Sequence, residues 1–255
     1  MSAVRHDLGP PVFSGDLAVL AAERVGDIVR LTFPVPDAFR GARAGQFALL
    51  SSNRPGAPLL GRPVSVILGE HLQFAFAVVG EGTRVLAASE PGERITVTGP
   101  LGHGFGMAAA ATLIVCDATH FGTFVALAME RHAAGTPVDI IYVQGEPTLA
   151  HLDAPVHASL EPFARGVQTV SLADLPDALA ARGPETLAAG ARDRVMAIAQ
   201  IHAARAGWIA EAALQAPMAC GLGVCKVCIH PARDGGTFLV CTGPTVPLTE
   251  PAFAP

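Results

Sequence analysis

Four of the five cysteines lie close to the C-terminal end of this 255-residue chain. Cys220, Cys225, Cys228 and Cys241 follow the spacing C-x4-C-x2-C-x12-C. A run of this kind with a distant fourth cysteine is the ligand pattern of plant-type 2Fe-2S clusters, in which four thiolates hold two irons. The spacing therefore predicts a redox centre that passes electrons singly.

The spacer between the first two cysteines supports this interpretation. It reads Gly221-Leu222-Gly223-Val224, and a loop that wraps a cluster needs glycines because its backbone must approach the sulfides and adopt positive φ. The N–H groups of such a loop can donate to sulfur and stabilise the extra negative charge of the reduced cluster. The loop is thus one means of setting the reduction potential.

The same cysteines have other possible uses. A zinc site more often shows two C-x2-C pairs, whereas the first spacer here has four residues. Disulfides need an oxidising compartment, which nothing in the sequence indicates. A Rieske-type centre would replace two cysteines by histidines, so we expect His230 to be only a neighbour. Cys116 ends an apolar run and is expected to be an inert core residue.

The elements that must position the cysteines fall into two patterns, and the first predicts a barrel. From about Leu17 to Gly99 the chain alternates short β-runs with turns rich in Gly and Pro, which predicts a small antiparallel barrel of five or six strands. The strands expected are Asp27 to Phe33, Gln46 to Leu50, Pro63 to Ile67, Leu72 to Val79 and Arg94 to Val97.

The second pattern begins at about residue 108 and predicts a parallel sheet. Ala111 to Val115, Phe121 to Ala134 and Val138 to Val143 read as strand, helix and strand, which is a βαβ unit. A further strand at Val167 to Ser171 and helices at Leu175 to Ala181 and Val195 to Ala206 complete a sheet of four or five strands. The predicted fold class is β plus α/β, with a barrel over 1–104, a Rossmann-like domain over 105–213 and a cluster-binding segment over 214–255.

Composition narrows the class of protein. Lys and Arg total 17 against 22 Asp and Glu, a net charge of −5, so nucleic acid is not an expected partner. The most apolar stretch, Met107 to Cys116, is far shorter than the roughly 20 residues of a membrane-spanning helix.

The first twenty residues lack the basic start, apolar stretch and small-residue cleavage site of a secretory signal. We therefore expect a cytoplasmic protein. Only 15% of residues are charged, which indicates either apolar surface covered by a partner subunit or alanine in place of surface polar residues.

The order of barrel, parallel α/β domain and cluster loop resembles the electron-transfer subunits of two-subunit dihydroorotate dehydrogenases, which are relatives of the ferredoxin reductases. The motifs that carry the resemblance are Ala44-Gly45-Gln46-Phe47, Arg62-Pro63-Val64-Ser65, Gly80-Glu81-Gly82-Thr83, Gly99-Pro100-Leu101-Gly102-His103-Gly104-Phe105, Met218-Ala219-Cys220-Gly221 and Cys241-Thr242-Gly243-Pro244. The resemblance covers about residues 15 to 246. It implies a ferredoxin reductase-like fold.

The resemblance also implies that the barrel binds FAD. Arg62 would pair with the pyrophosphate as a planar fork, and Ser65 would hydrogen-bond near the isoalloxazine. The N–H groups and hydroxyl around Gly82 and Thr83 would bind the second phosphate. The remaining members of the expected site are Pro63, Val64, Ala75, Phe76 and Ala77, and Ala77 stands where the family often has a basic residue.

The chain departs from the family where a nicotinamide dinucleotide would bind. The family has a Gly-Gly-Gly-x-Gly turn, whose small residues let the pyrophosphate approach a helix N-terminus. Here the turn is Cys116-Asp117-Ala118-Thr119-His120-Phe121-Gly122, and the family's Cys-Gly-Pro corresponds to Ala189-Gly190-Ala191. Asp117 would place a negative charge near an anionic ligand, which is unfavourable unless Asp117 is paired or protonated. We therefore expect FAD and the cluster to be retained and NAD(H) binding to be weak or absent.

Two points about this turn stay open at the level of sequence. The backbone could keep its path despite the substitutions, in which case NADH would still bind. His120 could contact a ligand, although a lone histidine at a strand end is more often a capping or core group.

By this resemblance the chain would be an FAD and 2Fe-2S electron-transfer subunit in pyrimidine synthesis. It would pass electrons between an FMN-containing dihydroorotate dehydrogenase-type subunit and an external carrier, as part of a hetero-oligomer. No residue of this chain resembles the base for dihydroorotate oxidation, so no catalytic residue is expected.

Two other functions are compatible with the sequence. One is a stand-alone NADH-dependent reductase that feeds an oxygenase, although its ferredoxin domain is usually longer than Leu214 to Pro255 allows. The other is a non-catalytic regulatory subunit with a vestigial flavin site and a structural metal.

Overall fold

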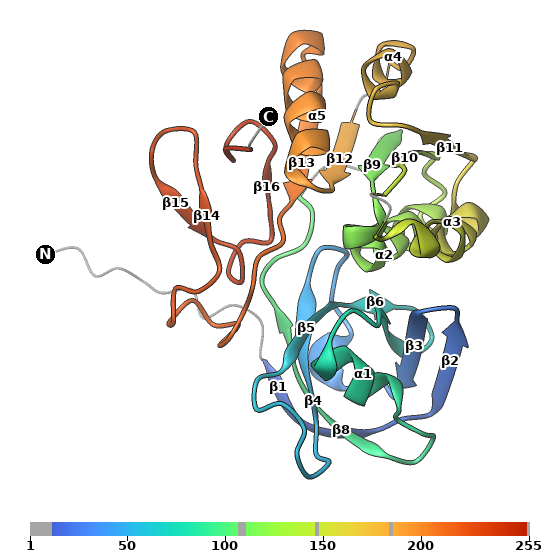
Figure 1. The fold of residues 1–255 in the computed structure, drawn as a ribbon, viewed down its shortest axis with the longest axis vertical. Helices are drawn as coiled ribbons and strands as arrows, with labels where there is room; N and C mark the ends of the chain where they lie inside the picture. The colour runs from blue at the N-terminus through green and yellow to red at the C-terminus, as the bar shows by residue number, and fades with distance from the viewer. Residues whose placement is uncertain (1–11, 107–110, 146–147, 184–185, 254–255) are drawn as a thin grey trace, which may run out of the picture.

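The computed structural model describes residues 12–106, 111–145, 148–183 and 186–253. Antiparallel β-structure, a parallel α/β layer and a cysteine-bearing extension follow one another along the chain (Figure 1). No helix in these residues is both long and apolar enough to cross a membrane.

The N-terminal part, residues 12–106, consists of two four-stranded antiparallel sheets and is called the barrel below. One is made of β1 (Phe13–Ala18), β8 (Arg94–Leu101), β4 (Phe47–Ser52) and β5 (Arg62–Ser65), and the other of β2 (Ala21–Val25), β3 (Ile28–Phe33), β7 (Leu72–Ala77) and β6 (Ile67–Leu68). Alternate apolar side chains of both sheets, such as Leu31, Phe74 and Val97, share one core. The connections contain η1 (Asp37–Phe39) and α1 (Glu81–Ala87).

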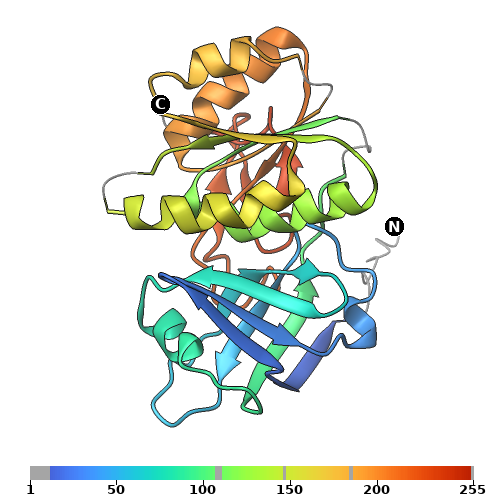
Figure 2. The ribbon, with the colours of Figure 1, turned by 90° about the vertical axis from the view of Figure 1, so that its right-hand side faces the viewer.

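The second part is a six-stranded sheet with the order β11-β10-β9-β12-β13-β16. Its parallel strands are β9 (Thr112–Cys116), β10 (Val138–Val143), β11 (Gly166–Val170), β12 (Thr186–Gly190) and β13 (Ile209–Ala213). The helices and short turns around it are η2 (Ala118–His120), α2 (Phe121–Ala133), η3 (Ala150–Leu152), α3 (Asp153–Leu160), η4 (Glu161–Phe163), α4 (Leu175–Ala180) and α5 (Asp193–Ala206). In Figure 2, α2 and α3 cover the face toward the barrel, and α4 and α5 cover the opposite face.

The strand order of this sheet reverses between β9 and β12. The chain runs from β9 outward to β10 and β11, and then returns to β12 and β13 on the other side. Every residue of β9 and β12 is buried, as expected for strands covered on both faces. In open α/β sheets, ligands bind outside the carboxyl ends of the strands at such a reversal.

The cysteine-bearing segment is joined to the α/β sheet by backbone hydrogen bonds. It contains a hairpin of β14 (Ile229–Pro231) and β15 (Thr237–Leu239). The chain then returns as β16 (Thr245–Pro247), which pairs antiparallel with β13. Cys228 and Cys241 are buried in the same core as Leu187 of β12. The cysteine loop is therefore part of the packed structure.

The predicted fold class is confirmed, while several elements differ from the sequence expectations. The βαβ unit lies within one or two residues of its predicted bounds. The sheet has six strands rather than four or five because β16 adds an antiparallel edge strand. β12 was not predicted, because its Ala188-Ala189-Gly190 end lacks the β-branched residues typical of strands. β13, β1, β2, α1 and α3 were also not predicted.

Candidate functional site

A cleft of about 300 Å³ lies where the barrel, the α/β layer and the cysteine-bearing segment meet. The barrel wall includes seven of the residues expected to bind FAD, namely Pro63, Val64, Ser65, Ala75, Phe76, Ala77 and Thr83. The second wall is residues 118–123, at the start of α2. The third includes Gln215, Met218 and Pro244, which flank the cysteines in sequence.

Arg62 and Gly82, the other two residues expected to bind FAD, lie together beside a second, smaller hollow. A Cβ atom at Gly82 would be only 2.6 Å from Cδ of Arg62, so a glycine is needed for the arginine to lie there. Nη2 of Arg62 donates to the carbonyl of Leu60 at 2.7 Å. No carboxylate in the described ranges forms an ion pair with Arg62. Its charge is therefore available to a phosphate group.

Thr83 holds the turn at the start of α1. The N–H groups of Val79 and Gly80 donate to Thr83 Oγ1 at 3.0 and 3.1 Å, and its hydroxyl is 3.0 Å from the carbonyl oxygen of Gly80. The hydroxyl that the sequence suggested for a phosphate is thus already engaged within the turn. Thr83 shapes the backbone that faces Arg62.

The barrel and α2 touch directly at the cleft. Ser65 Oγ and Thr123 Oγ1 are 2.7 Å apart, which is a hydrogen bond between the two parts. A Cβ atom at Gly122 would be 3.1 Å from the carbonyl oxygen of Ala75, so the glycine permits this close approach. These contacts set the separation between the barrel wall and the α/β wall.

The four cysteines lie on the loop between β13 and β14 and just after β15. A side-chain contact links Cys220 to Cys225, and another links Cys241 to Cys228. In the described part of the chain, no three His, Cys, Asp or Glu side chains form a group that could hold a metal ion.

The glycines of the cysteine loop adopt the conformation that the sequence predicts. Gly221 and Gly223 have φ of 69° and 78°, which confirms the expected positive values. A Cβ atom at Gly223 would also be 2.8 Å from Cγ2 of Thr242. Both glycines therefore let the loop fold tightly around its cysteines.

Backbone N–H groups donate to the cysteine sulfurs. Cys220 Sγ accepts from the N–H groups of Leu222 and Cys225, at 3.3 and 3.5 Å. Cys241 Sγ accepts from Gly223 at 3.1 Å, and Cys228 Sγ accepts from Cys241 at 3.4 Å. The backbone donors lower the pKa of Cys220 to about 6, while burial raises the pKa of Cys241 to about 11. N–H donors directed at sulfur favour the thiolate, which is the form that binds metals.

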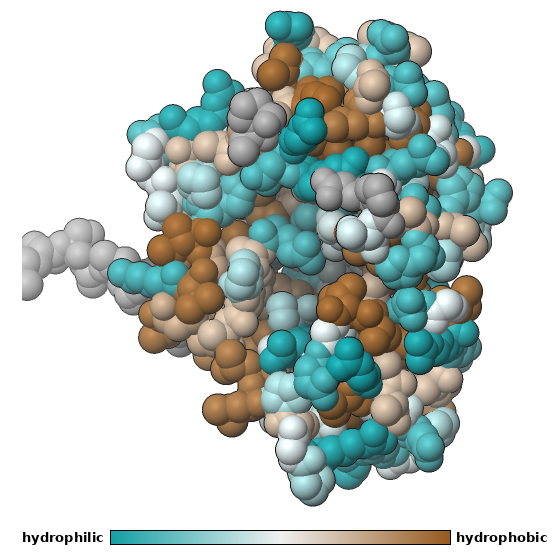
Figure 3. All heavy atoms as spheres, viewed as in Figure 1, coloured by the Kyte–Doolittle hydropathy of each residue, from teal (hydrophilic) through white to brown (hydrophobic). Residues whose placement is uncertain are grey.

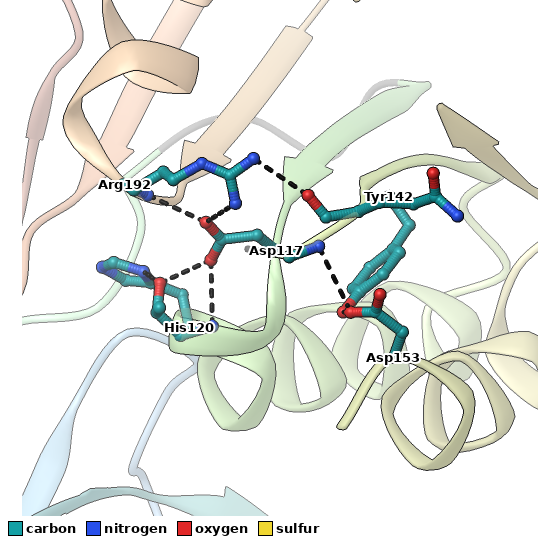
Figure 4. Close-up of polar contacts among 8 residues, drawn as sticks. Asp117, His120, Tyr142, Asp153 and Arg192 are labelled. Atoms are coloured by element: carbon teal, nitrogen blue, oxygen red, sulfur yellow. Dashed lines mark hydrogen bonds and ion pairs between the residues drawn. The ribbon is translucent and has the colours of Figure 1, made fainter. Parts of the chain in front are cut away.

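The turn after β9 is closed by an ion pair, shown in Figure 4. Asp117 is 1% exposed, and its Oδ1 accepts the N–H of Thr119 at 2.9 Å. Its Oδ2 accepts the N–H of Arg192 at 3.0 Å and lies 3.6 Å from the guanidinium of the same residue. Nη2 of Arg192 donates to the carbonyl of Gln144 at 2.9 Å. Asp117 is therefore paired, which offsets the cost of burying its charge.

His120 lies between this turn and the cleft that it lines. Its Nδ1 is 2.8 Å from Thr119 Oγ1, whose hydroxyl donates to Asp117. Nε2 is buried and has no hydrogen-bond partner among the residues described. Burial lowers the pKa of His120, against the opposing influence of Asp117. Of the uses left open by the sequence, the structure shows a buried side chain, and His120 makes no hydrogen bond that caps α2.

Arg192 is the site residue that sequence reasoning missed. It is 75 positions from Asp117, and no local motif marks an arginine after an alanine-rich strand as the partner of a distant carboxylate. Only the parallel pairing of β9 with β12, which places Cys116 opposite Gly190, brings the two together.

Comparison with known proteins gives no matching family model. The electron-transfer subunit of dihydroorotate dehydrogenase B (NAD(+)) of Desulforamulus reducens is 38% identical over 95 residues, which is 35% of this chain and 36% of that protein. The subunit of the same name from Geobacillus thermodenitrificans is 28% identical over 204 residues, covering 72% and 76%. The homolog from Aquifex aeolicus is 28% identical over 244 residues, covering 88% and 92%.

Solved structures show the same fold. The structure of an NADH-dependent reduced ferredoxin-NADP oxidoreductase, a protein of flavin-based electron bifurcation, has a TM-score of 0.73 and 18% identity, covering 93% of this chain and 90% of that one. A flavohemoglobin from Malassezia yamatoensis has a TM-score of 0.57 and 15% identity, covering 76% and 57%. The chain therefore has a ferredoxin reductase-like fold, and over most of its length it is similar in sequence to electron-transfer subunits of dihydroorotate dehydrogenase B.

Proposed function

We propose that this chain is the FAD- and 2Fe-2S-binding electron-transfer subunit of a dihydroorotate dehydrogenase-type complex. The observation that carries this proposal is the shared cleft. Met218 precedes Cys220 by two residues and Pro244 follows Cys241 by three, and both line the same cleft as Ser65. The expected flavin and cluster sites are therefore neighbours.

The residues of the barrel wall fit a flavin nucleotide. Arg62 offers a guanidinium with no carboxylate partner in the described ranges. It lies next to the turn whose backbone is fixed by hydrogen bonds to Thr83. Ala75, Phe76 and Ala77 provide a mostly apolar wall, and Ser65 adds a hydroxyl at its edge. We assign Arg62 to the diphosphate, with Gly82 leaving it room, and the apolar wall to the ring system.

The cysteine loop fits a 2Fe-2S cluster. Its N–H groups already face sulfur, which stabilises negative charge at the site. Bound there, flavin and cluster would supply the exchange between paired and single electrons. The chain's own residues would hold the two groups next to each other, because both expected sites line the same cleft.

The surface around the cysteines fits a protein partner. Large apolar side chains of the cysteine loop and the start of β14 are exposed, namely Leu222 at 57%, Val224 at 78%, Val227 at 52% and Ile229 at 47%. Figure 3 shows apolar residues gathered on the side where this segment lies. Exposed apolar clusters of this kind mark interaction sites. We assign this surface to an FMN-containing catalytic subunit in a hetero-oligomer.

Spectra and metal analysis of matched variants test the proposed cofactors. The purified chain should show flavin and iron-sulfur absorbance and contain FAD, iron and sulfide. Cys228→Ala should lose iron and sulfide and keep FAD, because a loop ligand is removed and the barrel is untouched. Cys116→Ala is the control, since Cys116 is buried in β9 and away from the loop, and it should keep both groups.

The same preparation separates the other functions. A colourless wild-type chain would contradict the proposal and favour a regulatory subunit. A coloured chain that purifies alone and is bleached by NADH would favour a stand-alone reductase. Copurification with a second, FMN-containing subunit would support the complex.

A further inference from the structure

We propose that Asp117 and Arg192 together exclude NAD(H) from the α/β layer, because the chain places its own carboxylate where this fold receives a dinucleotide. This rests on the proposed function, since it concerns which carrier exchanges electrons with the flavin. Asp117 would be a specificity-determining residue, and the external carrier would be something other than a nicotinamide.

The position of the pair carries the first step. β9 and β12 are adjacent parallel strands whose last residues, Cys116 and Gly190, lie opposite one another. Asp117 follows the first strand directly, and Arg192 follows the second by two residues. Both lie at the carboxyl edge of the sheet where the strand order reverses. Dinucleotides bind in open α/β sheets at this edge, with the diphosphate at the first strand-to-helix turn.

The positive charge and the N–H donors at this edge already interact with the carboxylate of Asp117. A diphosphate needs free N–H groups and positive charge from the turn. Here the N–H groups of Thr119 and Arg192 donate to Asp117, and the guanidinium of Arg192 lies beside the same carboxylate. A bound diphosphate would have to take these donors from Asp117 and leave two anionic groups side by side. Such a contact is unfavourable.

The turn at this edge also carries larger side chains than a diphosphate site uses. Close approach of a diphosphate needs small residues in the turn, but Thr119, His120 and Phe121 stand there, and Phe121 is 4% exposed. At the end of β12, a Cβ atom on Gly190 would be 2.7 Å from the ring of Phe124. The turn after β9 thus lacks small residues, and Gly190 is already packed against Phe124. NAD(H) does not fit this arrangement.

A second carboxylate, that of Asp153, accepts hydrogen bonds at the same edge of the sheet. Asp153 accepts the hydroxyl of Tyr142 at 2.6 Å and the N–H of Gly145 at 3.4 Å, just beyond the end of β10 (Figure 4). The backbone N–H groups that follow β9 and β10 therefore already donate to carboxylates of the chain itself, Asp117 and Asp153.

Calorimetric titration of the FAD- and cluster-loaded chain with NADH tests the inference. The wild type should show no saturable binding up to about 1 mM, the upper end of ordinary KM values. Asp117→Gly frees Arg192 and opens the turn, so we expect saturable binding with a Kd at least about tenfold below that 1 mM limit. Asp117→Asn removes the charge and keeps the shape of the side chain, and should gain less.

The control is Asp139→Asn. Asp139 forms ion pairs with Arg165 and Arg182 at the opposite, amino end of the sheet, so this variant should resemble the wild type. Saturable binding by the wild type would overturn the inference, and so would a folded Asp117→Gly chain that binds no NADH. FAD and iron are measured on each sample, because their absence would count against the proposed function, whereas the titration alone decides the exclusion.

Discussion

His120 has a buried nitrogen with no partner among the described residues, and this unmet hydrogen bond predicts a stabilising substitution. Leaving a buried acceptor unpaired costs about 1–3 kcal/mol, and Nε2 of His120 is such an atom. His120→Leu also gives up the contact with Thr119, so the net gain in unfolding free energy should be about 1 kcal/mol. Thermal unfolding of the purified chain measures it. A lower midpoint than that of the wild type would contradict the prediction.

The matched control is His132→Leu, at an exposed position of helix α2, which begins directly after His120. Surface changes of this kind usually alter stability by no more than about 0.5 kcal/mol. An equal gain in both variants would show that added hydrophobicity, rather than the unpaired nitrogen of His120, is responsible.

The same histidine predicts a pH dependence. Burial lowers the pKa of His120 below the ordinary 6.5, so the unfolded chain takes up the proton first as the pH falls. The stability tied to the neutral ring is complete above about pH 6.5 and declines below it. The advantage of His120→Leu should therefore widen between pH 7.5 and 5.5. A constant difference in thermal midpoint across that range would contradict this account.

At the scale of elements, the second residue of helix α1, Gly82, leaves room for the Arg62 side chain at the start of β5. In Gly82→Ala the new Cβ would lie 2.6 Å from Cδ and Nε of Arg62, so the guanidinium must move. Losing a charge-assisted contact to phosphate costs about 1.5–3 kcal/mol, so we expect FAD binding to weaken about tenfold or more, as measured by flavin fluorescence.

Gly80→Ala provides the comparison for that variant. Gly80 immediately precedes α1, has φ of −168°, and a Cβ atom there would meet nothing within 4 Å. FAD affinity should match that of the wild type. Equal weakening in both variants would point to the helix start in general rather than to the contact between Gly82 and Arg62.

At the scale of the whole molecule, the cysteine loop leaves large apolar side chains exposed, and this predicts how the chain binds a partner. Val224→Asp places a charge in the exposed apolar cluster around the cysteines, where Val224 is 78% exposed. Complex formation with the catalytic subunit should fall at least about tenfold, because a desolvated charge opposes binding. Size-exclusion chromatography of the mixed subunits measures this effect.

Val25→Asp is the control for docking. Val25 lies on β2 of the barrel, away from the cysteines, and is 62% exposed. This variant should bind the partner like the wild type, and both variants should keep their iron and FAD. Binding by Val224→Asp that equals the wild type would move the docking surface elsewhere.

The sequence by itself determined what depends on short-range spacing. The C-x4-C-x2-C run places three cysteines on one loop whatever the rest of the chain does, and Gly221 and Gly223 supply its positive φ values. The βαβ unit could be predicted because short apolar runs, typical of buried strands, flank a segment whose apolar residues follow the helical period. β12 gave no such signal, since its alanines are explained only by the helices that cover both faces of the sheet.

Only the tertiary structure decided how distant residues meet. The partner of Asp117 is Arg192, and their pairing depends on the parallel alignment of two strands 75 residues apart in sequence. The cleft depends on three parts of the chain that converge through contacts such as Ser65 with Thr123. Such contacts are fixed by the packing of whole elements, so residue spacing could name the candidate sites but not their geometry.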